Sequence, residues 1–152
     1  MGGITATLED YLEVILNIAS RNGVARSMEI ASKLNVKRPT VTVALRSLAD
    51  KGMVNYSPGS YITLTKKGKD IARHIDKRHH ILKEFFIDVL GVSQDWAEDV
   101  ACKMEHGMSV EVCRRMKGFL NALKKDEAFA EKLRTKILQE SEDFKCHKSC
   151  LK

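Results

Sequence analysis

Three residues in the second half of the chain have the types and spacing of metal ligands. Cys102, Glu105 and His106 occupy positions i, i+3 and i+4 of a predicted helix. At about 100° per residue, they fall within an arc of roughly 100° and share one helix face. A thiolate or a main-chain carbonyl, a carboxylate and an imidazole on one face suit a divalent transition metal from the middle of the first row.

Two acids and a histidine elsewhere in the chain offer further ligands of the same kind. Asp10 and Glu13 are one turn apart in the first predicted helix, and His79 lies in a long predicted helix beside His80. Each group also has an ordinary structural interpretation. A helical cysteine is usually a small buried apolar residue, a Glu–His pair is usually a solvated face, and an acid near a helix start can serve only the helix dipole. The fold must therefore decide between a metal site and these alternatives.

The tail carries a third group of donors, Cys146, His147 and Cys150. This spacing fits half of a zinc or iron–sulfur site or a redox sensor, and it equally fits incidental cysteines in a basic tail. The motif is short and has no second cysteine pair, so the sequence leaves these alternatives open.

Catalytic motifs do not accompany these donors. Cys102 and His106 have no visible orienting group or oxyanion-hole motif. The glycines are terminal or isolated, so the sequence has no glycine-rich phosphate-binding loop. We therefore expect that the protein is not an enzyme.

The composition is typical of a globular protein, with 43% apolar and 30% charged residues among 152. No apolar stretch is long enough to span a bilayer. The N-terminus carries acids and lacks a basic leader, so it does not resemble a secretory signal. We expect a cytoplasmic protein whose four cysteines are thiols or metal ligands rather than disulfides.

The positive charge is concentrated in one segment. The formal net charge is +6, and residues 26–73 alone carry ten basic and three acidic side chains. A basic segment beside a nearly neutral remainder indicates a module that binds a polyanion such as nucleic acid, although a solvated basic face is the alternative.

The same segment has the element order of a winged helix-turn-helix. Apolar spacing predicts helices over about 7–20, 28–34 and 39–51, with Ser27 as the N-cap of the second helix and Pro39 in the first turn of the third. Two β-prone runs, 53–56 and 61–64, flank Ser57-Pro58-Gly59-Ser60 and predict a hairpin.

In such a unit the third helix can enter the major groove of DNA while the hairpin lies along the backbone. The wing has no basic residue at its tip, but three lysines follow it closely. A winged helix that contacts another protein is the alternative. The candidate DNA-contacting residues are Lys37, Arg38, Pro39, Thr40, Thr42, Arg46 and Lys51.

The remainder of the chain is predicted to be helical. Thr65 begins a helix that runs to about Leu90, and Ser93, Ser109 and Asp126 begin helices that end near His106, Leu123 and Glu142. The predicted fold is mainly α. It comprises a winged helix-turn-helix domain over 1–73, a helical domain over 74–142 and a cysteine-containing tail over 143–152.

These features together resemble the diphtheria toxin repressor family of metal-dependent transcriptional regulators, including its manganese-responsive branch. The strings that carry the resemblance are LEDYLEVI, RPTVTVALRSLADKGMV, ITLTKKGKDIARHIDKRHHILKEFFIDVLGV and DVACKMEHGMS. The resemblance covers roughly residues 5–140, and the CxxEH string at its distance from the RH-bearing helix is the most specific part.

The resemblance implies a homodimer that binds Mn(II) or Fe(II) and then binds operator DNA, usually to repress metal-uptake genes. The N-terminal domain would bind DNA, and the second domain would bind metal and dimerise. The chain resembles the short members, which lack an SH3-like third domain. The metal ligands that the resemblance implies are Asp10, Glu13, His79, Cys102, Glu105 and His106.

The implied ligand set combines features of two branches. Asp10 stands where manganese-type members have Asp, whereas Cys102 stands where iron-type members have Cys. Oxygen ligands favour Mn(II) and a thiolate favours softer ions, so the sequence leaves the metal open. The second site of iron-type members uses a Glu and a His where this chain has Lys83 and Glu98. An ammonium group does not ligate, so an iron-type second site is not expected. The alternative function is a metal-independent winged-helix dimer that binds DNA.

Overall fold

The computed structural model describes residues 4–142. The chain divides into two compact units, residues 1–77 and 78–152, and each is described by itself below. The predicted tail 143–152, with Cys146, His147 and Cys150, lies outside the described residues.

The N-terminal unit begins with α1, Ala6–Asn22. The Thr5 hydroxyl accepts a hydrogen bond from the Leu8 amide at its start, and Gly23 with φ 78° ends it. A positive φ at the C-cap is a conformation that glycine adopts without steric cost, so the predicted end at Asn22-Gly23 is confirmed.

The helix-turn-helix consists of α2, Ser27–Lys33, and α3, Arg38–Asp50. Asn35, with φ 51°, makes the turn between them. The prediction that Ser27 is the N-cap of α2 is wrong, because Ser27 already has helical structure and Arg26 is the cap. The Glu29 carboxylate accepts the Arg26 backbone N–H at 2.9 Å, which satisfies a donor that the helix leaves unpaired.

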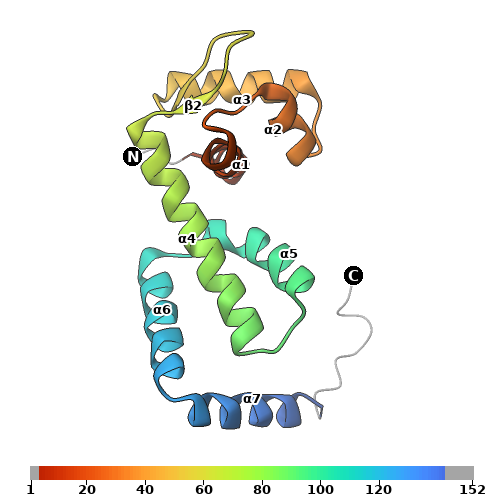
Figure 1. Cartoon of the computed structure of the whole chain (residues 1–152), viewed down its shortest axis with the longest axis vertical. Helices are drawn as coiled ribbons and strands as arrows, with labels where there is room; N and C mark the ends of the chain where they lie inside the picture. Colours follow the sequence, from red (N-terminus) through yellow and green to blue (C-terminus); the bar gives the residue numbers. More distant parts are fainter. Residues whose placement is uncertain (1–3, 143–152) are drawn as a thin grey trace. The chain divides into compact units, whose positions relative to one another are not determined.

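The predicted hairpin is confirmed as a two-stranded antiparallel sheet of β1, Val54–Asn55, and β2, Thr63–Leu64. Val54 pairs with Leu64, and Asn55 pairs with Thr63. A further bridge joins Ala25 to Ile62, so the hairpin is also hydrogen-bonded to the segment before α2. In Figure 1 the loop of this hairpin, drawn in yellow, projects beyond α3.

One apolar core holds the N-terminal unit together. It joins all three helices to both strands, and its fully buried side chains include Leu12, Ile15, Ile30, Leu45, Leu48 and Ile62. Because the outer face of α3 contributes nothing to this core, its polar and charged side chains remain available to a partner.

The long helix α4, Lys66–Asp88, packs closely against the wing where it begins. The Thr65 hydroxyl accepts the Gly68 N–H at 3.1 Å, so Thr65 caps α4 as predicted. A Cβ on Gly68 would lie 1.9 Å from the carbonyl oxygen of Met53. Glycine is therefore required here by close approach of two backbones rather than by its own φ.

The second unit contains α5, Gln94–Met104, a 3-10 turn over Glu105–Gly107, α6, Val110–Lys125, and α7, Glu127–Glu142. Ser93, Ser109 and Asp126 accept amide hydrogen bonds at the starts of α5, α6 and α7, as predicted. Helical structure ends near His106 as predicted, but the α-helix itself stops at Met104 and continues as the 3-10 turn.

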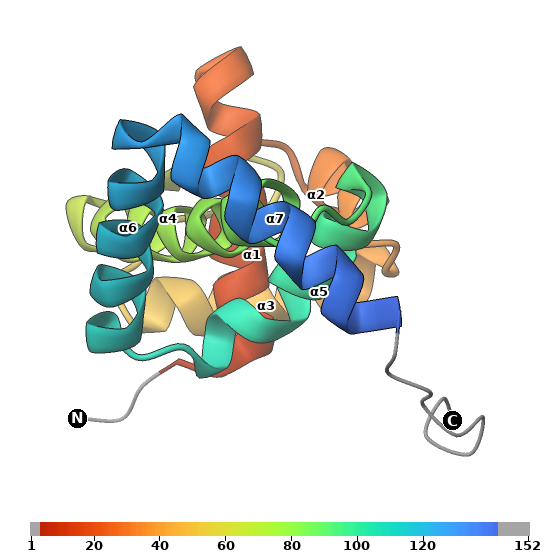
Figure 2. The same cartoon turned by 90° about the horizontal axis from the view of Figure 1, so that it is seen from below.

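The C-terminal half of α4 lies at the centre of the second unit, as Figures 1 and 2 show. Leu82 and Phe86 pack with Ala97 and Ala101 of α5, and Val89 belongs to a cluster with the buried residues of α6 and α7. The two alanines allow close approach of α5 to α4. This packing fixes the α5 side chains beside those of α4.

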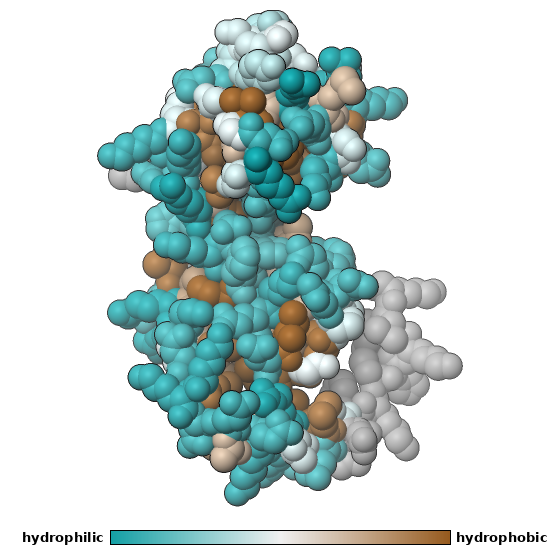
Figure 3. All heavy atoms as spheres, in the orientation of Figure 1, coloured by the Kyte–Doolittle hydropathy of each residue, from teal (hydrophilic) through white to brown (hydrophobic). Residues whose placement is uncertain are grey.

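On the face drawn in Figure 3, the side chains of each unit are mainly hydrophilic, and small hydrophobic patches lie among them. Within the part of the chain that the structure describes, no helix is long and apolar enough to cross a membrane.

We expect Gly68→Ala to lower the free energy of unfolding of the protein by about 3 kcal/mol, because the added methyl group collides with backbone rather than with a flexible side chain. Gly118→Ala is the matched control, because its Cβ meets nothing within 4 Å and alanine favours an α-helix. Urea unfolding followed by circular dichroism measures both. An unchanged midpoint for Gly68→Ala would contradict the packing described here.

A second prediction concerns Glu84 of α4, which pairs with Lys117 at 2.9 Å and with Lys124, both on α6. Burial raises the pKa of Glu84, but hydrogen bonds from Lys124 and Lys117 outweigh burial and leave its pKa below the ordinary value. A carboxyl with a lowered folded-state pKa stabilises the fold above its unfolded-state pKa, and this contribution is lost as the pH falls through the folded-state pKa.

Glu84→Gln should therefore cost about 1 kcal/mol at pH 7. Below the folded-state pKa of Glu84, the difference from the unaltered protein should vanish. Denaturant unfolding at both pH values measures the difference, and a cost that does not change with pH would contradict an ionic role for Glu84.

Candidate metal centre and nucleic-acid interface

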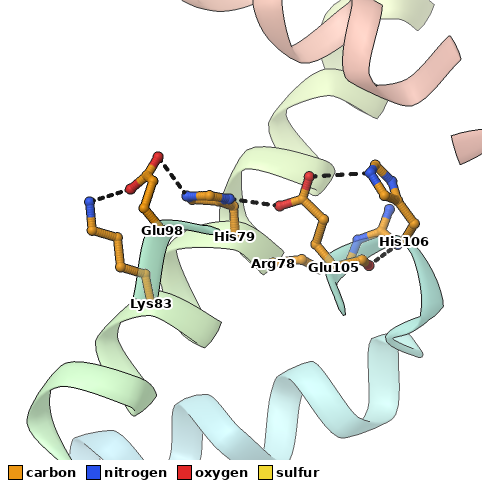
Figure 4. Close-up of polar contacts among 6 residues, drawn as sticks. All are labelled: Arg78, His79, Lys83, Glu98, Glu105 and His106. Carbon is orange, nitrogen blue, oxygen red and sulfur yellow. Dashed lines mark hydrogen bonds and ion pairs between the residues drawn. The ribbon is translucent and has the colours of Figure 1, made fainter. Parts of the chain in front are cut away.

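His79 is the centre of a row of charged and polar groups in the second unit. It lies on α4 with only 7% of its surface exposed. Its Nδ1 lies 2.9 Å from Glu105 Oε2, and its Nε2 lies 3.2 Å from Glu98 Oε1. Figure 4 shows the imidazole between these two carboxylates. Each ring nitrogen therefore faces a potential hydrogen-bond acceptor.

Glu105 is completely buried, which is unusual for a carboxylate. The Arg78 guanidinium donates to its backbone carbonyl at 3.2 Å, which holds the 3-10 turn against α4. Its Oε2 faces His79, but its Oε1 has no hydrogen-bond partner among the residues that the structure describes. His106 Nε2 lies 3.6 Å from Oε1, beyond hydrogen-bonding range.

A divalent cation fits this arrangement. A buried carboxylate oxygen without a partner costs free energy, and a cation bound there would compensate that cost. Imidazole nitrogens and carboxylate oxygens are donors that first-row divalent ions such as Mn(II) and Fe(II) accept. The structure therefore brings together three of the predicted donors, His79, Glu105 and His106.

Cys102 lies in the last turn of α5 and is exposed. Glu105 retains a right-handed helical backbone, with φ −60° and ψ −33°, so the two residues keep the predicted i, i+3 relation. Cys102 is nevertheless exposed while Glu105 is buried, a difference that the helical spacing alone did not reveal.

The N-terminal unit carries the two remaining predicted donors. Asp10 and Glu13 lie one turn apart on α1, and both side chains are partly buried. Nearby Tyr11 is buried, and burial together with the Asp10 charge raises its pKa.

Lys83 and Glu98 form an ion pair beside His79. Lys83 Nζ lies 2.6 Å from Glu98 Oε2. The hydrogen bond from Lys83 is the main cause that lowers the pKa of Glu98, and burial opposes it. In the sequence these two residues stand where iron-type members have metal ligands, and only the fold shows that they contact one another across α4 and α5.

The recognition surface of α3 and its flanks is largely open to solvent. Thr42 is only partly exposed, and its hydroxyl donates to the Arg38 carbonyl at 3.2 Å. The predicted DNA-contacting residues that are exposed are Lys37, Arg38, Pro39, Thr40, Arg46 and Lys51.

Two further residues, one on α3 and one beside the wing, are candidates for DNA contact that the sequence analysis did not name. Val43 is 68% exposed on α3, where an apolar side chain can contact a thymine methyl group. Its spacing from Pro39 and Arg46, i, i+4 and i+7, places it on the outer face and could have revealed it. Arg26 lies 5.1 Å from the ring centre of Tyr61 in the wing, so a guanidinium lies beside a hairpin whose tip has no basic residue.

Fold and site together define a class of protein. A winged helix-turn-helix with an exposed basic recognition helix is suited to bind DNA. A helical unit with a buried carboxylate between imidazoles is suited to bind a divalent metal. The class is that of metal-responsive DNA-binding regulators.

Comparison with known proteins assigns the family. Residues 3–61 match the N-terminal DNA-binding domain of iron-dependent repressors, and residues 65–133 match the metal-binding and dimerisation domain of the same family. The chain therefore belongs to the iron-dependent repressor family, which confirms the resemblance to the diphtheria toxin repressors.

Individual relatives agree with this assignment. An uncharacterised HTH-type transcriptional regulator of Methanocaldococcus jannaschii is 38% identical over 122 residues, which cover 80% of this chain and 98% of that protein. The transcriptional regulator MntR of Escherichia coli O6:H1 is 36% identical over 104 residues, 68% of this chain and 66% of MntR.

A solved manganese-dependent transcriptional repressor in complex with manganese has the same fold, with a TM-score of 0.70 and 28% identity. The match covers 75% of this chain and 52% of that protein, so the chain spans about half the length of this structural relative.

We expect Glu105→Gln to separate metal binding from folding. The neutral amide retains an acceptor for His79 but removes a buried charge, so the metal-free variant should be at least as stable as the unaltered protein. At a hundredfold excess over Kd, Mn(II) should stabilise the unaltered protein by about 2.7 kcal/mol and raise its melting temperature. In Glu105→Gln this rise should disappear.

Thermal unfolding with and without Mn(II) measures both effects. Glu111→Gln is the control, because Glu111 is an exposed acid paired with arginines on α6. A Glu105→Gln protein that Mn(II) stabilises as strongly as it does the control would remove Glu105 from the ligand set.

Proposed function

We propose that this protein is a homodimeric, metal-activated repressor that binds operator DNA when Mn(II) or Fe(II) occupies the site. The observation that carries the proposal is the buried Glu105 carboxylate, whose Oε1 has no hydrogen-bond partner and lies beside His106. The regulated genes would include those for metal uptake, as in the family that the sequence resembles.

The proposed ligands come from both units. The second unit supplies His79, Cys102, Glu105 and His106, and α1 of the N-terminal unit supplies Asp10 and Glu13. The carboxylates suit Mn(II) and Fe(II), while a thiolate from Cys102 would favour softer ions. When bound, the cation would supply positive charge that neutralises these acids.

The chain's own residues would couple the site to DNA binding. Asp10, Glu13 and Glu105 are all acidic, and like charges gathered in one ligand set would repel one another in the absence of a cation. A cation that binds more tightly to the DNA-competent arrangement shifts the population toward it, and this differential affinity is the origin of activation.

The two recognition helices of a dimer would then meet successive major grooves. Arg38 and Lys37 at the start of α3 would reach base edges, and Arg46 and Lys51 would contact phosphates. Val43 would add an apolar contact to the groove.

The second unit is suited to form the dimer. Large apolar side chains on α6 and α7 are exposed, including Val110, Phe119, Phe129 and Leu138. Burying such side chains against a second copy would be favourable, in keeping with the dimerisation domain that this segment matches.

We further propose a cytoplasmic location, because operator DNA is there, and we assign no catalysis to the protein. The described residues include no helix that could span a membrane, and the matching relatives are transcriptional regulators.

The test is binding of metal-stripped protein to its own upstream DNA at fixed salt, with Mn(II), Fe(II), Co(II) or Zn(II) added back. We expect Mn(II) or Fe(II) to tighten binding at least tenfold, and Asp10→Asn to reduce this gain. Fluorescence anisotropy measures the affinity, and salt is fixed because phosphate contacts depend on it.

Equally tight binding with and without metal would overturn the proposal and favour a metal-independent winged-helix dimer. An unchanged metal response in Asp10→Asn would remove only Asp10 from the coupling. The order in which metals activate would show whether the oxygen donors or Cys102 determine the choice of metal.

A further inference from the structure

The chain places a permanent cation, the Lys83 ammonium, at one end of the row in Figure 4. The Glu98 carboxylate is divided between two partners. Its Oε2 accepts from Lys83 at 2.6 Å, and its Oε1 lies 3.2 Å from His79 Nε2. Each oxygen of the Glu98 carboxylate therefore has its own partner, and the contact with Lys83 fixes the orientation in which the other oxygen faces His79.

We propose that Lys83 and Glu98 are a positioning pair for His79. Lys83 holds Glu98, Glu98 accepts the Nε2–H of His79, and Nδ1 is left as the nitrogen that faces Glu105 and binds the metal. The inference rests on the proposed function, since it names the residues that prepare one ligand of that site.

The chemistry of imidazole ligands supports this role. A histidine that binds a metal through one nitrogen commonly donates the other N–H to a carboxylate, which fixes the tautomer and the ring orientation. Glu98 has the required chemistry and distance, and Glu105 occupies the opposite side at 2.9 Å from Nδ1.

Lys83 is needed because Glu98 is poorly restrained by packing. The Glu98 side chain is 56% exposed, whereas the Lys83 side chain is 26% exposed. An exposed glutamate samples several rotamers in water, and an ammonium at hydrogen-bonding distance restrains it. Leu82, next to Lys83 on α4, packs with Ala97, next to Glu98 on α5, so the two backbones that carry the pair are fixed.

The test uses Lys83→Met, Glu98→Ala and the double variant, with Lys83→Arg as the conservative replacement. The control is Lys103→Met, which breaks an exposed ion pair of the same type, Lys103 with Asp99 at 2.5 Å, one residue along the same helix from Glu98. Every variant is made in the full chain.

The first readout uses Zn(II), a diamagnetic ion that leaves the ring signals observable. Nitrogen-15 chemical shifts of the His79 ring in the Zn(II)-loaded protein report which nitrogen binds the metal and which carries the proton. We expect a metal-bound Nδ1 and a protonated Nε2 in the unaltered protein, in Lys83→Arg and in Lys103→Met, and a mixture of bound nitrogens in Lys83→Met and Glu98→Ala.

The second readout is the Mn(II) dissociation constant from calorimetry. We expect Glu98→Ala to weaken binding about tenfold, in the range typical of carboxylates that orient a histidine ligand. Lys83→Met should weaken it several-fold, and adding it to Glu98→Ala should have no further effect, because Lys83 acts through Glu98.

Lys83→Met with unchanged tautomer and unchanged Mn(II) affinity would overturn this inference and leave the proposed function intact. Independent, multiplicative effects of the two substitutions would also overturn it. Failure of the unaltered protein to bind Mn(II) or Fe(II) would instead overturn the proposed function, while the spectra of the Zn(II)-loaded protein would still test the Lys83–Glu98–His79 contact.

Discussion

The buried carboxylate of Glu105 is the constraint on which the second unit depends. Removing a charge from water costs several kcal/mol unless partners replace the water. The fold supplies His79 to Oε2 and leaves Oε1 without a hydrogen bond. Packing alone would favour an apolar residue at this position. An acid with one unsatisfied oxygen at this position fits the metal cation that we propose as its ligand, and His79 and His106 beside it are donors of the same kind.

Each unit has its own core, and this separation suits a switch. The N-terminal core joins α1, α2 and α3 to the hairpin, while the second core joins the end of α4 to α5, α6 and α7. A change at the ligands therefore need not unfold either core. It can act on the arrangement of two intact units, which is a population shift rather than a refolding event.

The sequence predicted most of the helices because their starts carry local signals. Thr65, Ser93, Ser109 and Asp126 all cap the helices that they were expected to cap, since a side-chain oxygen next to free amides acts over a few residues. Ser27 misled for the same reason. It has the right chemistry, but the Glu29 carboxylate stabilises a start one residue earlier, at Arg26.

The site was less predictable because it depends on contacts between helices. The sequence indicated the donors Cys102, Glu105, His106 and His79, and the family resemblance joined them into one ligand set. The sequence did not reveal that α5 tightens after Met104 or that Glu105 is completely buried. It also did not reveal that Glu98 faces His79. Val43 was missed because only polar and charged residues and Pro39 were considered as candidates for DNA contact on α3, although Val43 is exposed there.

A row of side chains runs from Lys83 through Glu98 and His79 to Glu105, and the ammonium at one end makes the two ends differ in their affinity for a cation. A divalent cation beside Glu98 would meet the Lys83 ammonium, a like charge that raises the free energy of binding there. Beside Glu105 Oε1 it would meet a buried carboxylate and the His106 imidazole instead. The ammonium thus makes one end of the row unfavourable for metal while orienting the histidine that serves the other end. A single lysine can therefore determine both where the cation binds and which nitrogen of His79 receives it.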